Sequence, residues 1–127
     1  MAFPRGVLLF SALAFAFFGA WAFVAPENQL SLVDVGVPNA TARADVRAQY
    51  GGFTLGMGVF LFACLARREW TAPGLLGSAC TLTGFALARA IGVTTDGPVS
   101  PTIYYLMAME GAGAALSWVG WRLSAKG

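Results

Sequence analysis

Residues 6–25 read GVLLFSALAFAFFGAWAFVA and contain no charged side chain. About 20 helical residues, at 1.5 Å each, cross a hydrocarbon core about 30 Å thick. Three further apolar runs of similar length follow, at residues 48–65, 72–91 and 102–121, and the only charges inside the four runs are Arg89 and Glu110. The sequence therefore predicts an all-α fold: a four-transmembrane-helix bundle with helices at approximately residues 6–25, 42–65, 72–91 and 102–121, in a single integral membrane domain over residues 1–127.

The composition excludes most soluble functions. Charged residues make up 11% of the chain, against about 25% in soluble domains. The net charge of +2, with no basic cluster on a soluble element, indicates that no nucleic acid is bound. Histidine is absent, which removes the commonest general base and all His-ligated metal sites. Cys64 and Cys80 are too few for a metal site and should pack as small apolar residues, so we expect no metal and no cofactor.

The N-terminus has some features of a signal peptide. Arg5 precedes an apolar core, and Ala20-Trp21-Ala22 forms a weak cleavage site. The apolar run is longer than the core of about 7–15 residues that signal peptides use. We therefore expect a retained helix.

Charges outside the apolar runs are distributed unevenly between the two sides of the predicted bundle. One side has Glu69 as its only acid, and its five basic residues are Arg5, Arg67, Arg68, Arg122 and Lys126. The other side has two basic residues, Arg43 and Arg47, and four acids, which are Glu27, Asp34, Asp45 and Asp96. Cytoplasmic loops are rich in Lys and Arg. We therefore expect both termini in the cytoplasm and residues 26–49 and 92–101 on the outer side.

Small residues recur at four-residue spacing on two of the predicted helices. Gly52 and Gly56 have this spacing on the second helix, and Gly113 and Ser117 have it on the fourth. Such faces let helix backbones approach closely within a membrane. The faces either pack inside the bundle or dock on another protein, and we expect Gly52 and Gly56 to make a close helix contact.

Glu110 is the most informative single residue, because it lies about 12 Å into the fourth helix. An ionised carboxylate at that depth needs a partner. Arg89 is the expected partner, since its side chain leans toward the N-terminus of its own helix and so toward the membrane centre. On the second helix, Arg47 leans toward the outer interface, where Asp45 or Asp96 is its expected partner.

Together these residues predict a polar cluster in the outer half of the bundle, formed by Arg47, Tyr50, Arg89, Asp96 and Glu110. Three interpretations are open. The cluster is a salt-bridge network that fixes helix register, a pocket for a ligand with a polar head, or part of a proton relay or transport path.

The same residues carry a resemblance. Residues 47–52, Arg-Ala-Gln-Tyr-Gly-Gly, followed by Arg89, Asp96-Gly97 and Glu110, resemble the pattern of a bacterial family known only as a domain of unknown function. Its members are similar four-helix membrane proteins, and the match covers nearly the whole chain. The resemblance implies the fold and a location in the bacterial inner (cytoplasmic) membrane, but no activity.

The function we expect is that of a non-enzymatic accessory or interaction subunit of a larger inner-membrane complex. Its partners are membrane lipids and either other integral membrane proteins or further copies of the chain. The alternative is a binder of a lipid-, isoprenoid- or quinone-like ligand in an outer-leaflet pocket, with Arg47 or Arg89 at the polar head. Glu110 and Tyr50 lack a nucleophile–base pair or a metal set, which argues against an enzyme. The sequence shows no internal repeat and no helix broken near the midplane, which also argues against a transporter.

Overall fold

The computed structural model describes residues 2–127, which form helices joined by short connections. The elements in chain order are α1 (Ala2–Val24), α2 (Pro26–Leu30), η1 (Ser31–Val33), α3 (Ala40–Val46), η2 (Arg47–Phe53), α4 (Thr54–Ala66), η3 (Arg68–Trp70), α5 (Thr71–Thr95) and α6 (Pro101–Ala125). The all-α prediction is confirmed. Each predicted helix is present, and α6 continues to Ala125, beyond the predicted end at residue 121.

Three helical segments are long and apolar enough to cross a membrane, and they are Ala2–Val24, Ala40–Ala66 and Arg68–Thr95. The second segment comprises α3, η2 and α4. Its middle part, η2, is a π-helix, a wider turn in which backbone hydrogen bonds span five residues. This turn was not predicted from the sequence. The fourth predicted span, α6, has 25 residues, but Glu110 and several other polar or small residues make it less apolar than the other three segments.

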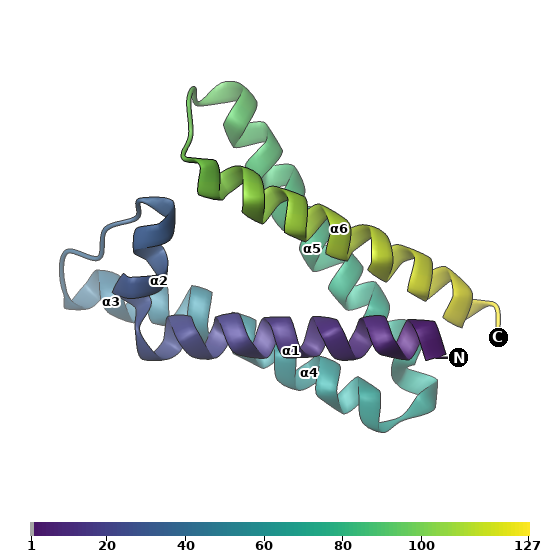
Figure 1. Ribbon diagram of the computed structural model, residues 1–127. Coiled ribbons are helices and arrows are strands. Elements are labelled where there is room, and N and C mark those ends of the chain that lie inside the picture. Colours follow the sequence, from purple (N-terminus) through teal and green to yellow (C-terminus); the bar gives the residue numbers. More distant parts are fainter. Residues whose placement is uncertain (1) are drawn as a thin grey trace.

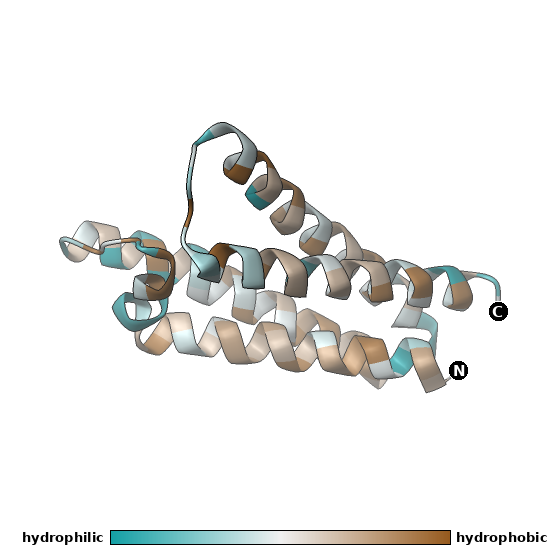
Figure 2. Ribbon diagram, turned by 45° about the horizontal axis from the view of Figure 1, so that its top comes forward, coloured by the Kyte–Doolittle hydropathy of each residue, from teal (hydrophilic) through white to brown (hydrophobic). Residues whose placement is uncertain are grey.

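The long helices form two antiparallel pairs (Figure 1). One pair is α1 with α4, and the other is α5 with α6. The pairs meet at the end of the molecule that contains both termini, which we call the closed end. They diverge at the opposite end, the open end, where α2 and α3 lie (Figure 1). Hydrophobic residues line the long helices along most of their length, and hydrophilic residues concentrate near their ends (Figure 2).

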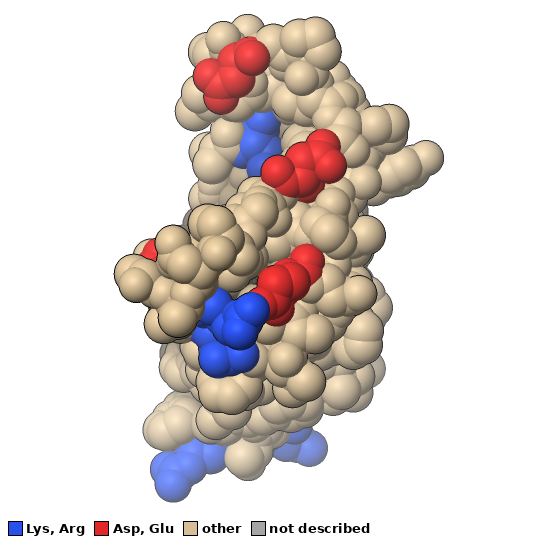
Figure 3. Space-filling model, turned by 90° about the vertical axis from the view of Figure 1, so that its left-hand side faces the viewer, with Lys and Arg blue, Asp and Glu red and all other residues tan. Residues whose placement is uncertain are grey.

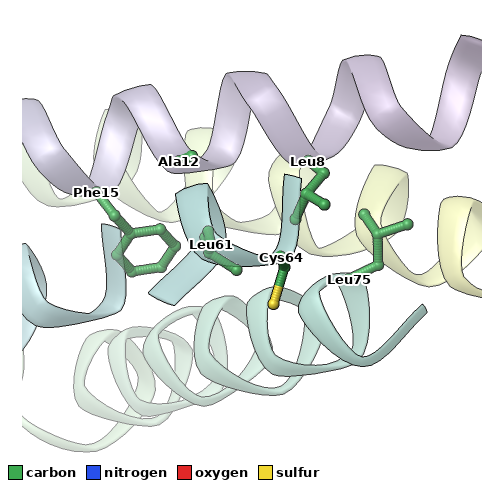
Figure 4. Packing of buried hydrophobic residues seen from close by; sticks show 6 residues of the cluster. All are labelled: Leu8, Ala12, Phe15, Leu61, Cys64 and Leu75. Carbon is green, nitrogen blue, oxygen red and sulfur yellow. The ribbon is translucent and has the colours of Figure 1, made fainter. Parts of the chain in front are cut away.

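The hydrophobic core joins the two pairs on the side of the closed end. Its buried members come from α1, α4 and α5 and are Leu8, Ala12, Phe15, Leu61, Cys64 and Leu75 (Figure 4). The buried residues of α5 all lie between Thr71 and Ala79. From Cys80 to Thr95 every residue of α5 is at least partly exposed, and the same holds for residues 101–109 of α6. The open-end half of this hairpin therefore has little cover from α1 and α4.

Glycines set the distance between α1 and the segment formed by η2 and α4. A Cβ atom on Gly58 would lie 2.8 Å from the backbone nitrogen of Ala16, and one on Gly51 would lie 2.8 Å from Cα of Phe23. A Cβ atom on Gly19 would overlap the backbone of Leu55. Real Cβ atoms do not approach backbone atoms this closely, so the pair depends on glycine at these positions.

The expected close contact at Gly52 and Gly56 is absent within the described chain. A Cβ on Gly56 would meet nothing within 4 Å, and one on Gly52 would meet only the carbonyl oxygen of Arg47, at 3.8 Å. The face that contacts α1 carries Gly51 and Gly58 instead. It is rotated by about one residue from the predicted face. On α6 the small residues do pack inside the chain, since a Cβ on Gly113 would lie 3.0 Å from Leu82 Cδ1 and Ser117 is fully buried.

Candidate functional site

Arg89 and Glu110 form an ion pair between α5 and α6. Arg89 donates from Nε to Glu110 Oε1 over 2.5 Å. The carboxylate residue is 8% exposed, while the arginine side chain is 26% exposed. This contact confirms the pairing expected from the sequence. It follows from the antiparallel hairpin, in which the arginine side chain leans back along α5 and reaches the level of Glu110 on α6.

Two further polar contacts hold the same hairpin together. The hydroxyl groups of Ser78 and Ser117 are 3.1 Å apart and buried, and Trp118 donates from its indole nitrogen to Thr83 Oγ1 over 3.0 Å. Hydrogen bonds between membrane helices contribute about 0.6 kcal/mol each on average. Ser78 and Thr83 were not among the predicted site residues, although a hydroxyl residue within an apolar run indicates a polar contact between helices.

Arg47 has a different partner from those expected. It donates from Nε to the carbonyl oxygen of Phe23 over 2.9 Å, next to the end of α1 at Val24. The last carbonyl groups of a helix lack partners within the helix, and a cation is favourable there. The predicted pairing of Arg47 with Asp45 or Asp96 is therefore wrong, because the end of α1 lies within reach of η2.

The five-residue cluster does not form one site. Tyr50 is 46% exposed on η2, and Asp96 is an exposed residue at the end of α5 whose carboxylate accepts a hydrogen bond from Thr95. Only Arg89 and Glu110 are joined by a contact. In the segment 47–52, Arg47 and Gly51 have a structural role against α1, whereas Tyr50 and Gly52 point outward.

A second ion pair lies at the open end. Arg43 Nε is 2.5 Å from Glu27 Oε1, and both side chains are about half exposed. A hydrogen bond to the backbone N–H of Glu27 itself, together with the bond and the charge of Arg43, lowers the pKa of this carboxylate below its ordinary value of 4.5. Acidic and basic side chains lie side by side on this end of the molecule (Figure 3). The pair ties α3 to α2.

Arg5 holds the helices together at the closed end. In the sequence it indicated only the orientation of the chain in the membrane. Its two terminal nitrogens donate to the carbonyl oxygen of Leu65, over 2.7 Å, and to Thr71 Oγ1, over 3.4 Å. Arg5 thus connects α1 to the last turn of α4 and to the start of α5. Within residues 2–127, no group of three or more Cys, Asp or Glu side chains could hold a metal ion.

A comparison with protein families identifies the chain at the level of a family. The model of the domain of unknown function DUF4345 matches residues 3–121. The chain belongs to the DUF4345 family. No curated protein and no solved structure matches it.

The matched region of this DUF4345 protein includes α1 to α5 and most of α6. It contains the Arg89–Glu110 pair, the contact of Arg47 with α1 and the glycine contacts between α1 and α4. Two shallow hollows on the surface lie elsewhere. One, of about 270 Å³, lies between α1 and α6 beside Phe10 and Gly113, and the other, of about 490 Å³, lies beside Phe17 and Trp21. Both are apolar and open.

Proposed function

We propose that this DUF4345 protein is a non-enzymatic accessory or interaction subunit of a larger complex in the bacterial inner membrane. It crosses the membrane four times, with the closed end and both termini in the cytoplasm. Three segments have the length and composition of membrane spans. The fourth span is α6, which packs along α5 and whose internal charge is neutralised by Arg89.

The orientation rests on the distribution of basic residues. The closed end carries Arg5 and the turn with Arg67 and Arg68, and it also carries Arg122 on α6 and Lys126 directly after α6. Basic residues beside membrane spans remain in the cytoplasm. At the open end, by contrast, Arg43 is paired with Glu27.

The observation that carries the proposal is the open space beside two glycines, one on α4 and one on α5, in the parts of these helices toward the open end. Gly56 on α4 and Gly84 on α5 each have open space where a side chain would stand. A glycine in a helix costs about 0.5–1 kcal/mol relative to alanine, and beside lipid it offers little contact in return. A helix from another protein can approach such a surface closely, and close approach is what associates helices in a membrane.

Native mass spectrometry after extraction in a mild detergent tests the proposal. The chain should retain a stoichiometric protein partner, and Gly56→Leu should remove that partner without lowering the stability of the isolated chain. Val59→Leu is the matched control, because Val59 is 62% exposed on the same helix and already carries a branched side chain. If the chain carries no partner, or if Gly56→Leu and Val59→Leu retain it equally, the proposal is wrong.

A further inference from the structure

Arg89 uses a small part of its hydrogen-bonding capacity within the protein. A guanidinium group has five N–H donors. The structure gives Arg89 one bond, from Nε to Glu110 Oε1. Among residues 2–127 its two terminal nitrogens have no hydrogen-bond partner, whereas both terminal nitrogens of Arg5 have one. Four N–H groups of Arg89 are therefore available to an acceptor from outside the chain.

The position of Arg89 makes such an acceptor favourable. Arg89 lies six residues before the last residue of α5, or about 9 Å from that end of the helix. Arg89 lies just inside the outer end of the predicted span, at residue 91, and an N–H group that faces the hydrocarbon layer from there is costly when it lacks a partner. The side chain is 26% exposed, so a molecule in the bilayer can reach it.

The charge of the pair selects the kind of acceptor. Arg89 and Glu110 together carry no net charge, so the pair has no excess positive charge to neutralise an anionic head, whose uncompensated charge at a membrane helix would be a cost. A neutral carbonyl oxygen on an apolar body avoids that cost. Phe85 and Val93 lie one turn before and one turn after Arg89 on the same face of α5, and Phe85 is 39% exposed. Its ring can stack on a flat, conjugated ligand.

We propose that the Arg89–Glu110 pair is a binding site for an uncharged, membrane-soluble carbonyl compound of the quinone class. The terminal N–H groups of Arg89 donate to a carbonyl oxygen of the ligand, Glu110 holds the guanidinium in place through Nε, and Phe85 contacts the ring.

The probe is a 1,4-benzoquinone with a decyl tail, titrated into the purified full-length protein in detergent. Quinones quench tryptophan fluorescence at short range, and Trp118 is bonded to Thr83, two residues from Phe85 on α5. A variant that keeps Trp118 as its only tryptophan should show saturable quenching. Decylbenzene, which has the same tail and no carbonyl group, should not compete.

The double substitution Arg89→Met with Glu110→Gln removes the donors without leaving a buried charge. It should raise the Kd for the quinone at least tenfold. The matched control, Arg43→Met with Glu27→Gln, removes the exposed ion pair and should bind as the parent does. If the double variant does not fold, Arg89→Lys takes its place, since an ammonium group keeps the charge but lacks the planar fork, and it should also bind more weakly. Non-saturable quenching in the parent, competition by decylbenzene, or an unchanged Kd on loss of the guanidinium would overturn the proposal.

Discussion

Gly58→Ala should destabilise this protein, although alanine is the better helix former. The added Cβ would lie 2.8 Å from the backbone nitrogen and 3.0 Å from Cα of Ala16, whereas carbon atoms pack favourably at about 3.5–4.0 Å. Because the obstructing atoms belong to the backbone of α1, the two helices must move apart. Overpacking of this kind costs about 1–3 kcal/mol, and a backbone clash belongs near the upper value. The helix propensity of alanine returns about 1 kcal/mol, which leaves a net loss of about 2 kcal/mol.

The same substitution at Gly56 should have the opposite sign. A Cβ there meets nothing within 4 Å, so the propensity gain of about 1 kcal/mol remains and the isolated chain becomes more stable. Gly56 and Gly58 lie two residues apart in α4, so each variant is the control for the other. Their free energies of unfolding should differ by about 3 kcal/mol, the sum of the net loss and the gain.

Reversible unfolding in mixed detergent micelles, followed by circular dichroism, measures this difference on the purified chain. Gly58→Ala should unfold at a lower denaturant concentration than the parent and Gly56→Ala at an equal or higher one. If Gly56→Ala loses as much stability as Gly58→Ala, the open space at Gly56 and the close approach at Gly58 cannot both be present in the folded protein.

Three further outcomes are expected. Arg89→Ala leaves Glu110 buried without its partner and should cost about 3–5 kcal/mol, so the double variant with Glu110→Ala should be more stable than Arg89→Ala in the same unfolding assay; additive losses would show that the two residues do not interact. The pKa of Glu27 is lowered in the folded state, so its contribution to stability is present above about pH 4.5 and is lost as the pH falls through the folded value. A pH titration should show that Glu27→Gln removes this part of the acid sensitivity, and an unchanged profile would contradict it. In a cysteine-free background, cysteine placed at Gly36 should react with a membrane-impermeant thiol reagent from outside and cysteine beside Arg68 should not, and the reverse pattern would overturn the orientation.

The helices were predictable from the sequence because their formation is a local property. An apolar run of about 20 residues has few alternatives to a helix in a membrane, and α1, α5 and α6 are where the sequence placed them. The pairing of Arg89 with Glu110 was also predictable. A lone charge inside a membrane is costly, and consecutive membrane helices run antiparallel. Both facts can be applied to the sequence without a structure.

Helix rotation and the partner of Arg47 were not predictable in the same way. Gly51, Gly52, Gly56 and Gly58 offer two possible contact faces, and the choice depends on the π-helical turn of η2 directly before α4. Nothing in the apolar pattern marks such a turn. The bond of Arg47 to Phe23 depends on where α1 ends relative to η2, which is a property of the packed pair and not of either segment alone.

Site-specific photo-crosslinking in the native membrane tests most directly whether the open surface of α4 meets another protein. A photoreactive residue at Gly56 should give one discrete crosslinked product that contains a second protein. The control position is Leu13, which is 54% exposed on α1 and should give no such product. We expect a discrete product from Gly56 alone. Reaction of Gly56 with lipid only, or the same products from both positions, would contradict the interaction-subunit function.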